Sequence, residues 1–469
     1  MIPLRLNEIA AATGGEVHPP EAGDVLVDGP VVTDSRQCTR GSLYVARVGE
    51  HADGHLYAGA AASTGAVGAL ATRPLTELPA VVVPDTQLAF GRLAHLVLER
   101  AGVPLVVGVT GSSGKTSTKD LLAQVLAAHG ETVANIESFN GEIGVPLTVC
   151  RVTTSTRHLV VEMGARGVGH IAYLTTIAPP RIGVVLNVGV AHVGEFGGRE
   201  QIALAKGELV AALPADGVAV LNADDPLVAA MASRTSARVL LVGEAMAADV
   251  RASSVILDHV GRPNFTVHTA AGAAHVALGL HGRHHVGNAL AVIAVALEAG
   301  MSLADTVAAL AAARPANRWR MEVTERADGV TVVNDAYNAN PDSMGAALRA
   351  LVAMNRSAEG QPRRTWAVLG EMFELGEASA AEHAGVGALA AQLHVDRLVT
   401  VGAGAEPIAA GALAAGMPAA QVLRADGTDT AYAMLERDMR PGDVVVFKSS
   451  RDAGLRWLGD RFAGKEVGS

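Results

Sequence analysis

Residues 106–120 read VVGVTGSSGKTSTKD, a run of small apolar residues followed by glycines and a Lys-Thr pair. The apolar run predicts a buried strand and the residues after Gly114 predict a helix, with the glycines as the turn between them. Glycines let backbone N–H groups point at phosphate oxygens, and a helix N-terminus adds a partial positive charge. The segment therefore predicts a phosphate-binding loop. A glycine-rich turn that simply precedes a helix is the structural alternative.

Particular residues of this loop suit the parts of a bound nucleotide. Lys115 is expected to neutralise the outer phosphates, and the Thr116 hydroxyl is expected to bind magnesium. The remaining residues of the predicted cradle are Gly111, Ser112, Ser113, Gly114 and Ser117. The spacing departs from the strict Walker pattern, because residue 109 is a valine where that pattern requires glycine. A phosphate loop alone does not identify the reaction.

The composition limits the class of protein. A chain of 469 residues predicts several domains, and 49% apolar with 18% charged residues indicates a folded protein. A net charge of −10 argues against nucleic acid as the main partner. Two cysteines cannot build a disulfide framework, which fits a reducing cytosol. The start lacks the long apolar stretch of a signal peptide, and the apolar run 289–297 is too short to span a membrane. We expect a cytoplasmic protein without membrane insertion.

The pattern of strands and helices predicts an α/β protein of three domains. Residues 1–98 contain short strand candidates and small loops, which indicate a small mixed α/β domain. Residues 99–315 alternate continuous apolar strands with Ala-rich helices, as in a mostly parallel sheet covered by helices on both faces. Polar–apolar alternation over 250–280 predicts an antiparallel addition, and ARPANRWR (313–320) predicts a linker. Residues 316–469 repeat the strand–helix alternation, which predicts a Rossmann-like C-terminal domain.

Three further residues occupy positions where catalytic groups gather in open α/β sheets. Glu162 ends the apolar run HLVVEMG, His192 follows another strand, and Lys206 lies inside a predicted helix. Taken singly, His192 could be an ordinary loop histidine and Lys206 a solvated residue on a helix surface.

Several segments, in their order along the chain, resemble the Mur ligase family of peptidoglycan synthesis. They are TGSSGKTS, NGEIGVPLT, VVEMGARGVGHI, NVGVAHVGEFGG and AKGEL. The family's phosphate loop shows the same departure from Walker spacing. The segment TDSRQCTRGSLYVARVGEHADGH is similar to the family's UDP-sugar-binding domain. NDAYNANPDSM and VLGEMFELGEASAAEHAGVG resemble the branch that joins D-alanyl-D-alanine to UDP-N-acetylmuramoyl-tripeptide. The resemblance covers about residues 33–451.

The resemblance implies an ATP-dependent ligase that forms an amide bond. ATP would phosphorylate the tripeptide's terminal carboxylate, and the dipeptide amine would then displace phosphate from the acyl phosphate. The family's roles place Thr116 and Glu162 on one magnesium ion. His192 and Lys206 would serve a second magnesium ion, with Glu162 shared. Because an ammonium has no lone pair for a cation, the resemblance implies that Lys206 is carbamylated.

The resemblance also assigns residues around the substrates. Asn288, Arg320 and Asp335 would reach the nucleotide, with a helix cap, a surface charge and a turn residue as their respective structural alternatives. Tyr337, Asn338 and Asn340 would flank the nucleotide and the substrates. Asp34, Ser35 and Arg36 would touch the UDP group, although they could equally form a structural turn. Ser449 stands where many relatives carry glycine, which leaves the role of Lys448 open. The third domain would bind the dipeptide and close over ATP about a hinge near residues 313–319.

Other functions fit the sequence less well. A Mur ligase that adds a single residue, diaminopimelate or lysine, is the nearest alternative; the diaminopimelate-adding enzyme usually carries an Asp-Asn-Pro-Arg stretch, which is absent here. Folylpolyglutamate synthase shares the style of phosphate loop but not the N-terminal segment. A nucleotide-gated binding module would bind ATP without substrate-dependent hydrolysis, and it leaves the pair His192 and Lys206 unexplained. The third residue of the accepted peptide stays open, and we expect a monomer.

Overall fold

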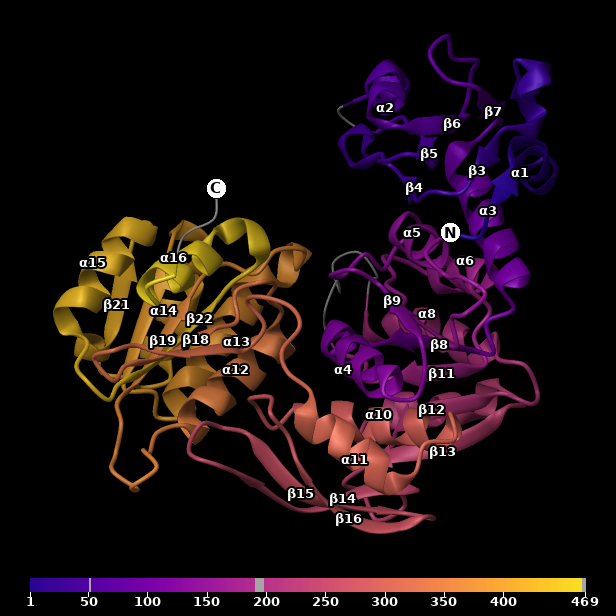
Figure 1. Ribbon diagram of the computed structural model, residues 1–469. Helices are drawn as coiled ribbons and strands as arrows, with labels where there is room; N and C mark the ends of the chain where they lie inside the picture. The colour runs from indigo at the N-terminus through magenta and orange to yellow at the C-terminus, as the bar shows by residue number, and fades with distance from the viewer. Residues whose placement is uncertain (50–51, 190–197, 466–469) are drawn as a thin grey trace.

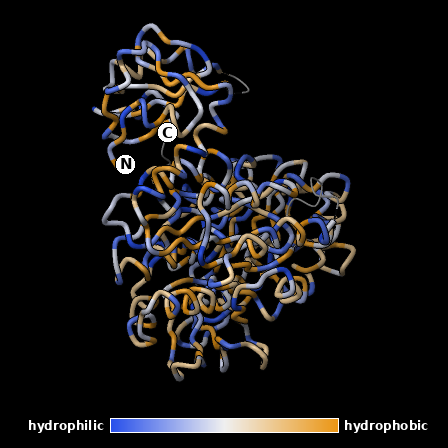
Figure 2. Tube along the Cα trace, turned by 90° about the vertical axis from the view of Figure 1, so that its right-hand side faces the viewer, coloured by the Kyte–Doolittle hydropathy of each residue, from blue (hydrophilic) through white to orange (hydrophobic). Residues whose placement is uncertain are grey.

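Three sheets organise the chain, one in each of three successive parts of the sequence. The computed structural model describes residues 1–49, 52–189 and 198–465. Figure 1 shows the first domain above the central one and the third domain beside it. In Figure 2, turned by 90°, the first domain again stands apart as a separate lobe.

The first domain is a small mixed α/β unit. Its five-stranded sheet has the order β2-β7-β6-β5-β4, with β2 antiparallel to β7 and the other pairs parallel. The sheet strands are β2 (Glu16–His18), β4 (Val31–Val32), β5 (Ser42–Val45), β6 (Ala66–Ala71) and β7 (Ala80–Val82). A separate ribbon pairs β1 (Leu4–Arg5) with β3 (Leu26–Val27), and the helices are α1 (Leu6–Thr13) and α2 (Ala58–Thr64).

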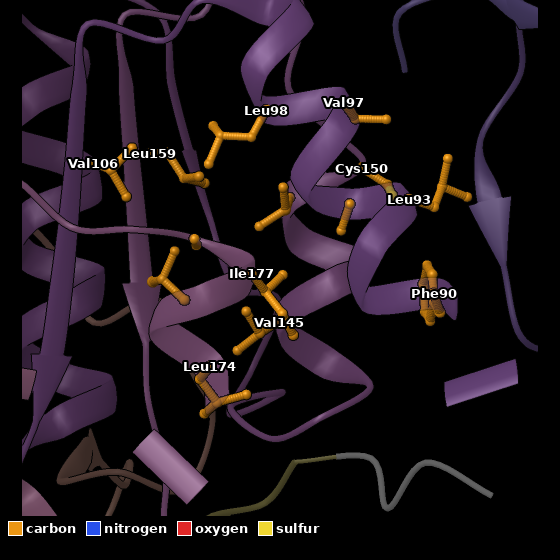
Figure 3. Packing of buried hydrophobic residues seen from close by; sticks show 14 of the residues in the cluster. Phe90, Leu93, Val97, Leu98, Val106, Val145, Cys150, Leu159, Leu174 and Ile177 are labelled. Atoms are coloured by element: carbon orange, nitrogen blue, oxygen red, sulfur yellow. The ribbon is translucent and has the colours of Figure 1, made fainter. Parts of the chain in front are cut away.

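Helix α3 (Thr86–Ala101) joins the first domain to the central one. It begins at the Asp85 cap, whose carboxylate accepts bonds from two backbone amides, and ends at Gly102 in the left-handed conformation (φ 63°). Its Phe90, Leu93 and Val97 are fully buried in one core that also contains residues of α1 and of the central helices α5 (Gly144–Val149) and α6 (His170–Ile177). Figure 3 shows this packing. Residue 98, the predicted domain boundary, lies inside this shared helix.

The central sheet has nine strands in the order β16-β15-β14-β13-β12-β11-β8-β10-β9. Its parallel part comprises β8 (Leu105–Thr110), β9 (Thr132–Ala134), β10 (His158–Glu162), β11 (Ile182–Val185), β12 (Val218–Asn222), β13 (Arg238–Gly243) and β14 (Val250–Leu257). The antiparallel addition is β15 (Pro263–Thr269) and β16 (Gly272–Ala277), within the predicted stretch.

Helices cover both faces of this sheet. One core contains α5, α6 and α8 (Arg199–Ala211), and the other contains α4 (Lys115–Ala127), α10 (His285–Glu298) and α11 (Leu303–Ala312). The short helix α9 (Pro226–Ala229) follows β12. Every residue of β8 is buried because this strand lies inside the sheet and both its faces are covered. The β8, β10 and β11 strands end at one edge of the sheet, where Glu162 is in register with Val109.

The third domain contains a six-stranded sheet in the order β17-β18-β22-β19-β20-β21, parallel except for β17. Its strands are β17 (Glu322–Glu325), β18 (Thr331–Asn334), β19 (Thr365–Leu369), β20 (Arg397–Val401), β21 (Val422–Ala425) and β22 (Val444–Lys448). Its helices are α12 (Pro341–Ala353), α13 (Ser379–Gln392), α14 (Glu406–Ala414), α15 (Thr428–Asp438) and α16 (Leu455–Phe462). The carboxyl ends of β18, β19 and β22 lie side by side.

The linker between the central and third domains is anchored at both ends. On the central side, the Arg314 backbone exchanges two hydrogen bonds with the Gln124 side chain, at 3.0 and 2.9 Å. On the other side, the buried Asp460 carboxylate accepts bonds from Arg318 and from the Trp319 indole, both at 2.8 Å. A second contact joins Gly261, in the turn between β14 and β15, to Met354 at the end of α12.

The predicted α/β class, with its small first domain and two larger mostly parallel sheets, is confirmed. The exact limits 1–98, 99–315 and 316–469 stay predictions. Cys38 and Cys150 are both buried and unpaired. Within the described ranges, no helix has both the length and the apolar character needed to cross a bilayer.

Candidate active site

A cavity of about 990 Å³ lies where the three domains meet. The first domain contributes Thr33 and Arg47 to its lining. The predicted residues that line it are Ser112, Ser113, Gly114, Lys115, Thr116, Ser117, Glu162, Lys206, Asn288, Arg320, Asp335, Tyr337, Asn338 and Asn340. Most of the predicted site is thus gathered around one space, although the residues are spread over 229 positions, from 112 to 340.

The phosphate loop connects β8 to α4 as predicted, and Gly111 lies at its start. Gly114 is the helix N-cap with φ 79°, a conformation that favours glycine, and a Cβ there would lie 2.8 Å from Asn288 Oδ1. The segment after β11 supports the loop: Ser113 N–H donates to Asn187 Oδ1 at 2.9 Å, and Gly189 N–H donates to Ser112 Oγ at 2.9 Å.

Lys115 folds back onto this loop. Its Nζ donates to the Gly111 carbonyl at 2.6 Å and to the Ser112 carbonyl at 3.3 Å. Burial lowers the pKa of Lys115, the Glu162 carboxylate opposes that shift, and the Arg320 cation adds to it. The ammonium thus lies inside the cradle, where phosphate oxygens would give it a counter-charge.

Glu162 presents one carboxylate oxygen with no partner among the described residues. The side chain is 1% exposed; its Oε1 accepts a bond from Asn140 Nδ2 at 2.6 Å, and its Oε2 is buried without a hydrogen bond. The backbone N–H of Glu162 donates to Asn135 Oδ1 at 2.6 Å, which fixes the strand end. A buried carboxylate oxygen without a donor is costly unless a cation or proton occupies the site, so it fits a metal ligand.

Lys206 lies inside α8, as predicted, with a relative exposure of only 6%. Burial, aided by the Lys115 cation, holds its pKa well below the usual value for lysine. Over the described residues its ammonium makes neither a hydrogen bond nor an ion pair. A solvated helix surface is therefore the wrong interpretation of this residue. His192, its predicted companion, lies outside the residues that the structure describes.

Arg320 and Tyr337 form the wall that the third domain contributes. The Arg320 guanidinium lies 4.3 Å from the centroid of the Tyr337 ring, a cation–π distance. Both reach the central domain: Tyr337 OH is 2.9 Å from Ser138 Oγ, and Arg320 Nη2 is 3.4 Å from the same atom. Arg320 Nε is buried with no acceptor in the described part of the chain. Arg320 is therefore a partly buried cation at a domain contact rather than a freely solvated surface charge.

Asp335 directly follows β18 and is tied to Lys448 at the end of β22. Lys448 Nζ donates to Asp335 Oδ2 at 2.7 Å, to the Asp335 carbonyl at 3.2 Å and to the Asn338 carbonyl at 3.0 Å. The second carboxylate oxygen, Oδ1, accepts the Met321 N–H at 3.0 Å. Lys448 thus fixes the loop that carries Asp335 and Asn338, which answers the question that Ser449 raised about its role.

Asn288 and Asn340 both lie near the start of a helix, but only one of them is an N-cap. Asn288 lies in the first turn of α10, whose N-cap is His284, so the helix-cap interpretation of Asn288 is wrong. Its side chain instead faces Gly114, and its Nδ2 is 3.3 Å from His285 Nδ1. Asn340 is a true cap: its Oδ1 accepts the Ser343 N–H of α12 at 2.9 Å.

In the first domain, the predicted triplet forms a turn. Asp34 caps a short 3₁₀ helix and pairs with Arg36 at 2.7 Å, and bonds from the Arg36 side chain and backbone lower the pKa of Asp34. Neither they nor Ser35 line the cavity; Thr33 and Arg47 do.

Arg47 was missed, although it follows the end of strand β5, the position that the strand-end rule singles out. Gly54 fits against its backbone, donating to the Arg47 carbonyl at 2.7 Å. Burial lowers the pKa of Arg47.

Known proteins match this arrangement over nearly the whole chain. Residues 109–296 match the Mur ligase middle domain, and residues 319–451 match the glutamate ligase domain of Mur ligases. UDP-N-acetylmuramoyl-tripeptide–D-alanyl-D-alanine ligase of Mycobacterium tuberculosis is 48% identical, over 98% of each chain. The chain belongs to the Mur ligase family. The Escherichia coli protein of the same description is 37% identical to this Mur ligase over 86% of each chain.

Solved structures agree with this assignment. The MurF crystal structure from Acinetobacter baumannii superposes with a TM-score of 0.89 at 31% identity, covering 99% of each chain. MurF ligase from Thermotoga maritima, in complex with ADP, gives a TM-score of 0.81 at 28% identity, over 94% of this chain and 98% of that one. The three-domain architecture of this Mur ligase is therefore that of the MurF structures.

Proposed function

We propose that this Mur ligase joins D-alanyl-D-alanine to the terminal carboxylate of UDP-N-acetylmuramoyl-tripeptide at the expense of ATP. The observation that carries the proposal is the cavity in which three features meet: a phosphate loop, a buried carboxylate oxygen that has no partner among the described residues, and a wall from each outer domain. The relatives that match over nearly the full length carry this activity in their names. Addition of a single amino acid such as lysine or diaminopimelate is not favoured.

The reaction consists of two displacements. A carboxylate oxygen of the tripeptide attacks the γ-phosphorus of ATP, and ADP leaves. The dipeptide amine then attacks the carbonyl carbon of the acyl phosphate, phosphate leaves with the bonding electrons, and the new amide loses a proton. Two anions must first be held in line despite their repulsion, so positioning and charge neutralisation carry most of the catalysis.

The cationic groups of the cavity suit the first displacement. Lys115 and the loop N–H groups would hold the β- and γ-phosphates. Arg320, whose Nε lacks an acceptor among the described residues, would reach the same phosphates from the third domain. Asn288 and Asp335 would contact the nucleotide, while Tyr337, Asn338 and Asn340 would border it.

Magnesium fits the acidic side of the cavity. Glu162 Oε2 and the buried Thr116 hydroxyl are the oxygen donors that this hard cation prefers. Bound there, the ion would neutralise charge on the transferring phosphoryl group.

Lys206 can join such a site only in another chemical form. Addition of carbon dioxide to its amine, with loss of a proton, would give a carbamate, which supplies oxygen ligands and a negative charge. A second ion held by His192 and carbamylated Lys206, with Glu162 shared, completes the proposed set.

The remaining proposals concern substrates and setting. Thr33 and Arg47 are better placed than Asp34, Ser35 and Arg36 to meet the UDP-linked substrate, because they line the cavity. A cytoplasmic location and a monomeric state stay predictions.

Phosphate release from ATP tests the proposed function. Purified protein receives UDP-N-acetylmuramoyl-tripeptide together with D-alanyl-D-alanine, D-alanine, L-alanyl-L-alanine, lysine or diaminopimelate. Only D-alanyl-D-alanine should support rapid release and a new amide product. Preferred use of diaminopimelate with the UDP-muramoyl dipeptide would overturn the proposal while leaving the family assignment intact.

A further inference from the structure

The turn after β19 (residues 370–374) is held by hydrogen bonds that other segments make to its backbone groups. Gly370 N–H donates to the Lys448 carbonyl at 2.9 Å, and the Glu371 carbonyl accepts the Ser450 N–H at 2.9 Å. The next two amides are bound by side chains. Met372 N–H donates to His383 Nε2 at 2.8 Å, and Phe373 N–H donates to Ser450 Oγ at 2.9 Å.

His383 uses both of its ring nitrogens to hold this turn and its own helix. It is fully buried in α13, and its Nδ1 is 2.7 Å from the Ser379 carbonyl. An amide N–H can only donate, so Nε2 must be the acceptor and Nδ1 must carry the proton that goes to Ser379. Both ring nitrogens are therefore committed, and one of them reaches out of its own helix to the turn. The Ser450 side chain, 4% exposed, is equally enclosed.

The turn directs two side chains into the active-site cavity. The Met372 side chain is buried below it, while Phe373, 40% exposed, and Glu374 line the cavity. Glu374 has φ 65°, a left-handed conformation that is unfavourable for residues other than glycine or asparagine. The bonds to His383 and Ser450 hold the residues just before it.

The chemistry of this wall suits the acceptor, and it lies outside the parts of the lining assigned above to the nucleotide and the UDP group. The phosphate loop and Arg320 face the nucleotide, and Thr33 and Arg47 come from the first domain. Phe373 and Glu374, with Arg451 and Asp452 after Ser450, form a part of the third-domain lining that combines an apolar ring with charges of both signs. A zwitterionic dipeptide with two methyl groups needs those properties.

We propose that His383 and Ser450 are positioning residues for the acceptor dipeptide: they fix two consecutive amides so that Phe373 and Glu374 form one wall of its pocket. The proposal rests on the proposed function for the identity of the acceptor. His383 does not line the cavity, so it acts through the turn; Ser450 borders the cavity and holds the turn by accepting the Phe373 N–H.

The test uses variants that separate the two bonds of His383. His383→Asn keeps a donor for Ser379 but is too short to reach Met372, whereas His383→Gln can present an oxygen to the Met372 N–H. Ser450→Ala removes only the acceptor for Phe373. The KM for D-alanyl-D-alanine should rise roughly tenfold in His383→Asn and Ser450→Ala, as expected when one buried amide loses its partner. His383→Gln should restore much of the loss.

The KM values for ATP and UDP-N-acetylmuramoyl-tripeptide serve as internal controls and should change by less than about twofold, within the effect of a distant substitution. Equal rises for all three substrates, or an unchanged KM for the dipeptide, would overturn the proposal. If His383→Asn does not fold, Ser450→Ala decides by the same criterion. A wild-type enzyme that rejects D-alanyl-D-alanine would instead refute the proposed function.

Discussion

The hydroxyl groups of Ser138 and Tyr337 lie 2.9 Å apart, although Ser138 belongs to the central domain and Tyr337 to the third. Arg320 stacks on the same tyrosine ring and approaches the same serine. The two domains thus meet beside the phosphate loop through a small polar contact. A contact of this kind can form and break as the third domain moves.

Tyr337→Phe should lower turnover by about fivefold, because it removes one hydrogen bond worth about 1 kcal/mol and keeps the ring beneath Arg320. Ser138→Ala should have a similar effect, and the double variant should be little worse than either one. Steady-state ligation rates of the four proteins measure this coupling. Effects that simply add would show that the contact does not act as a unit.

Arg320→Ala should reduce turnover far more than it reduces affinity for UDP-N-acetylmuramoyl-tripeptide, since we propose that its cation serves the phosphates and that the first domain holds the UDP group. Phosphate release and direct binding of the UDP substrate give the two quantities. Small-angle scattering adds a check on closure: the protein should compact when an ATP analogue and the UDP substrate are both present. An unchanged radius of gyration would contradict a closing hinge.

Lys115→Met should abolish turnover without loss of the fold, because the ammonium neutralises charge that grows during phosphoryl transfer. Circular dichroism and thermal melting establish that the variant is folded. Phosphate release near the wild-type rate by a folded Lys115→Met protein would refute the assignment.

Lys206→Ala should be almost inactive if a carbamate is needed, and small carboxylic acids should restore part of the activity by entering the vacated space. Lys119→Ala is the matched control. Lys119 is just as buried, at 2% exposed, but is paired with Asp120 at 2.5 Å and donates to the Asn135 carbonyl. Its loss should not be rescued by carboxylic acids. Full activity of Lys206→Ala would remove the carbamate from the mechanism.

Asp460→Ala should destabilise the third domain and its junction with the linker by about 2–3 kcal/mol. The fully buried carboxylate accepts bonds from Arg318, the Trp319 indole and Asn334; the first two would lose this acceptor, while Asn334 keeps its bond to the Arg456 carbonyl. Urea denaturation of the variant measures the loss. Arg437→Ala, whose partner Asp438 is its own neighbour on the surface, should cost much less.

The parts of the site that could be predicted from the sequence are those fixed by local geometry. A strand, glycines and a helix start define the loop around Lys115, and the ends of parallel strands put Glu162 and Asp335 at the edges where they are found. Lys206 looked ambiguous by itself, because burial of a helix face depends on packing that no short window contains.

The contacts that could not be predicted from the sequence join distant segments. Ser138 and Tyr337 are 199 positions apart, and Phe373 is bound by a serine 77 positions later. Conversely, Asp34 and Arg36 resembled binding residues but satisfy each other across one turn. Which polar groups are left for a substrate emerges only when every internal partner is known.

The shared core around α3 joins the first domain firmly to the central one. Arg92 and His95 of α3 bind backbone carbonyls of the first and central domains, and the apolar side chains between them pack against both. The shared core thus holds the first domain, where we expect the UDP group to bind, in place relative to the phosphate loop. An extended peptide gains about 3.5 Å for each residue, so a UDP-linked dipeptide would leave its carboxylate one such step short of ATP. If the first domain holds the UDP group, we expect it and α3 together to select the length of the peptide before its chemical identity is read.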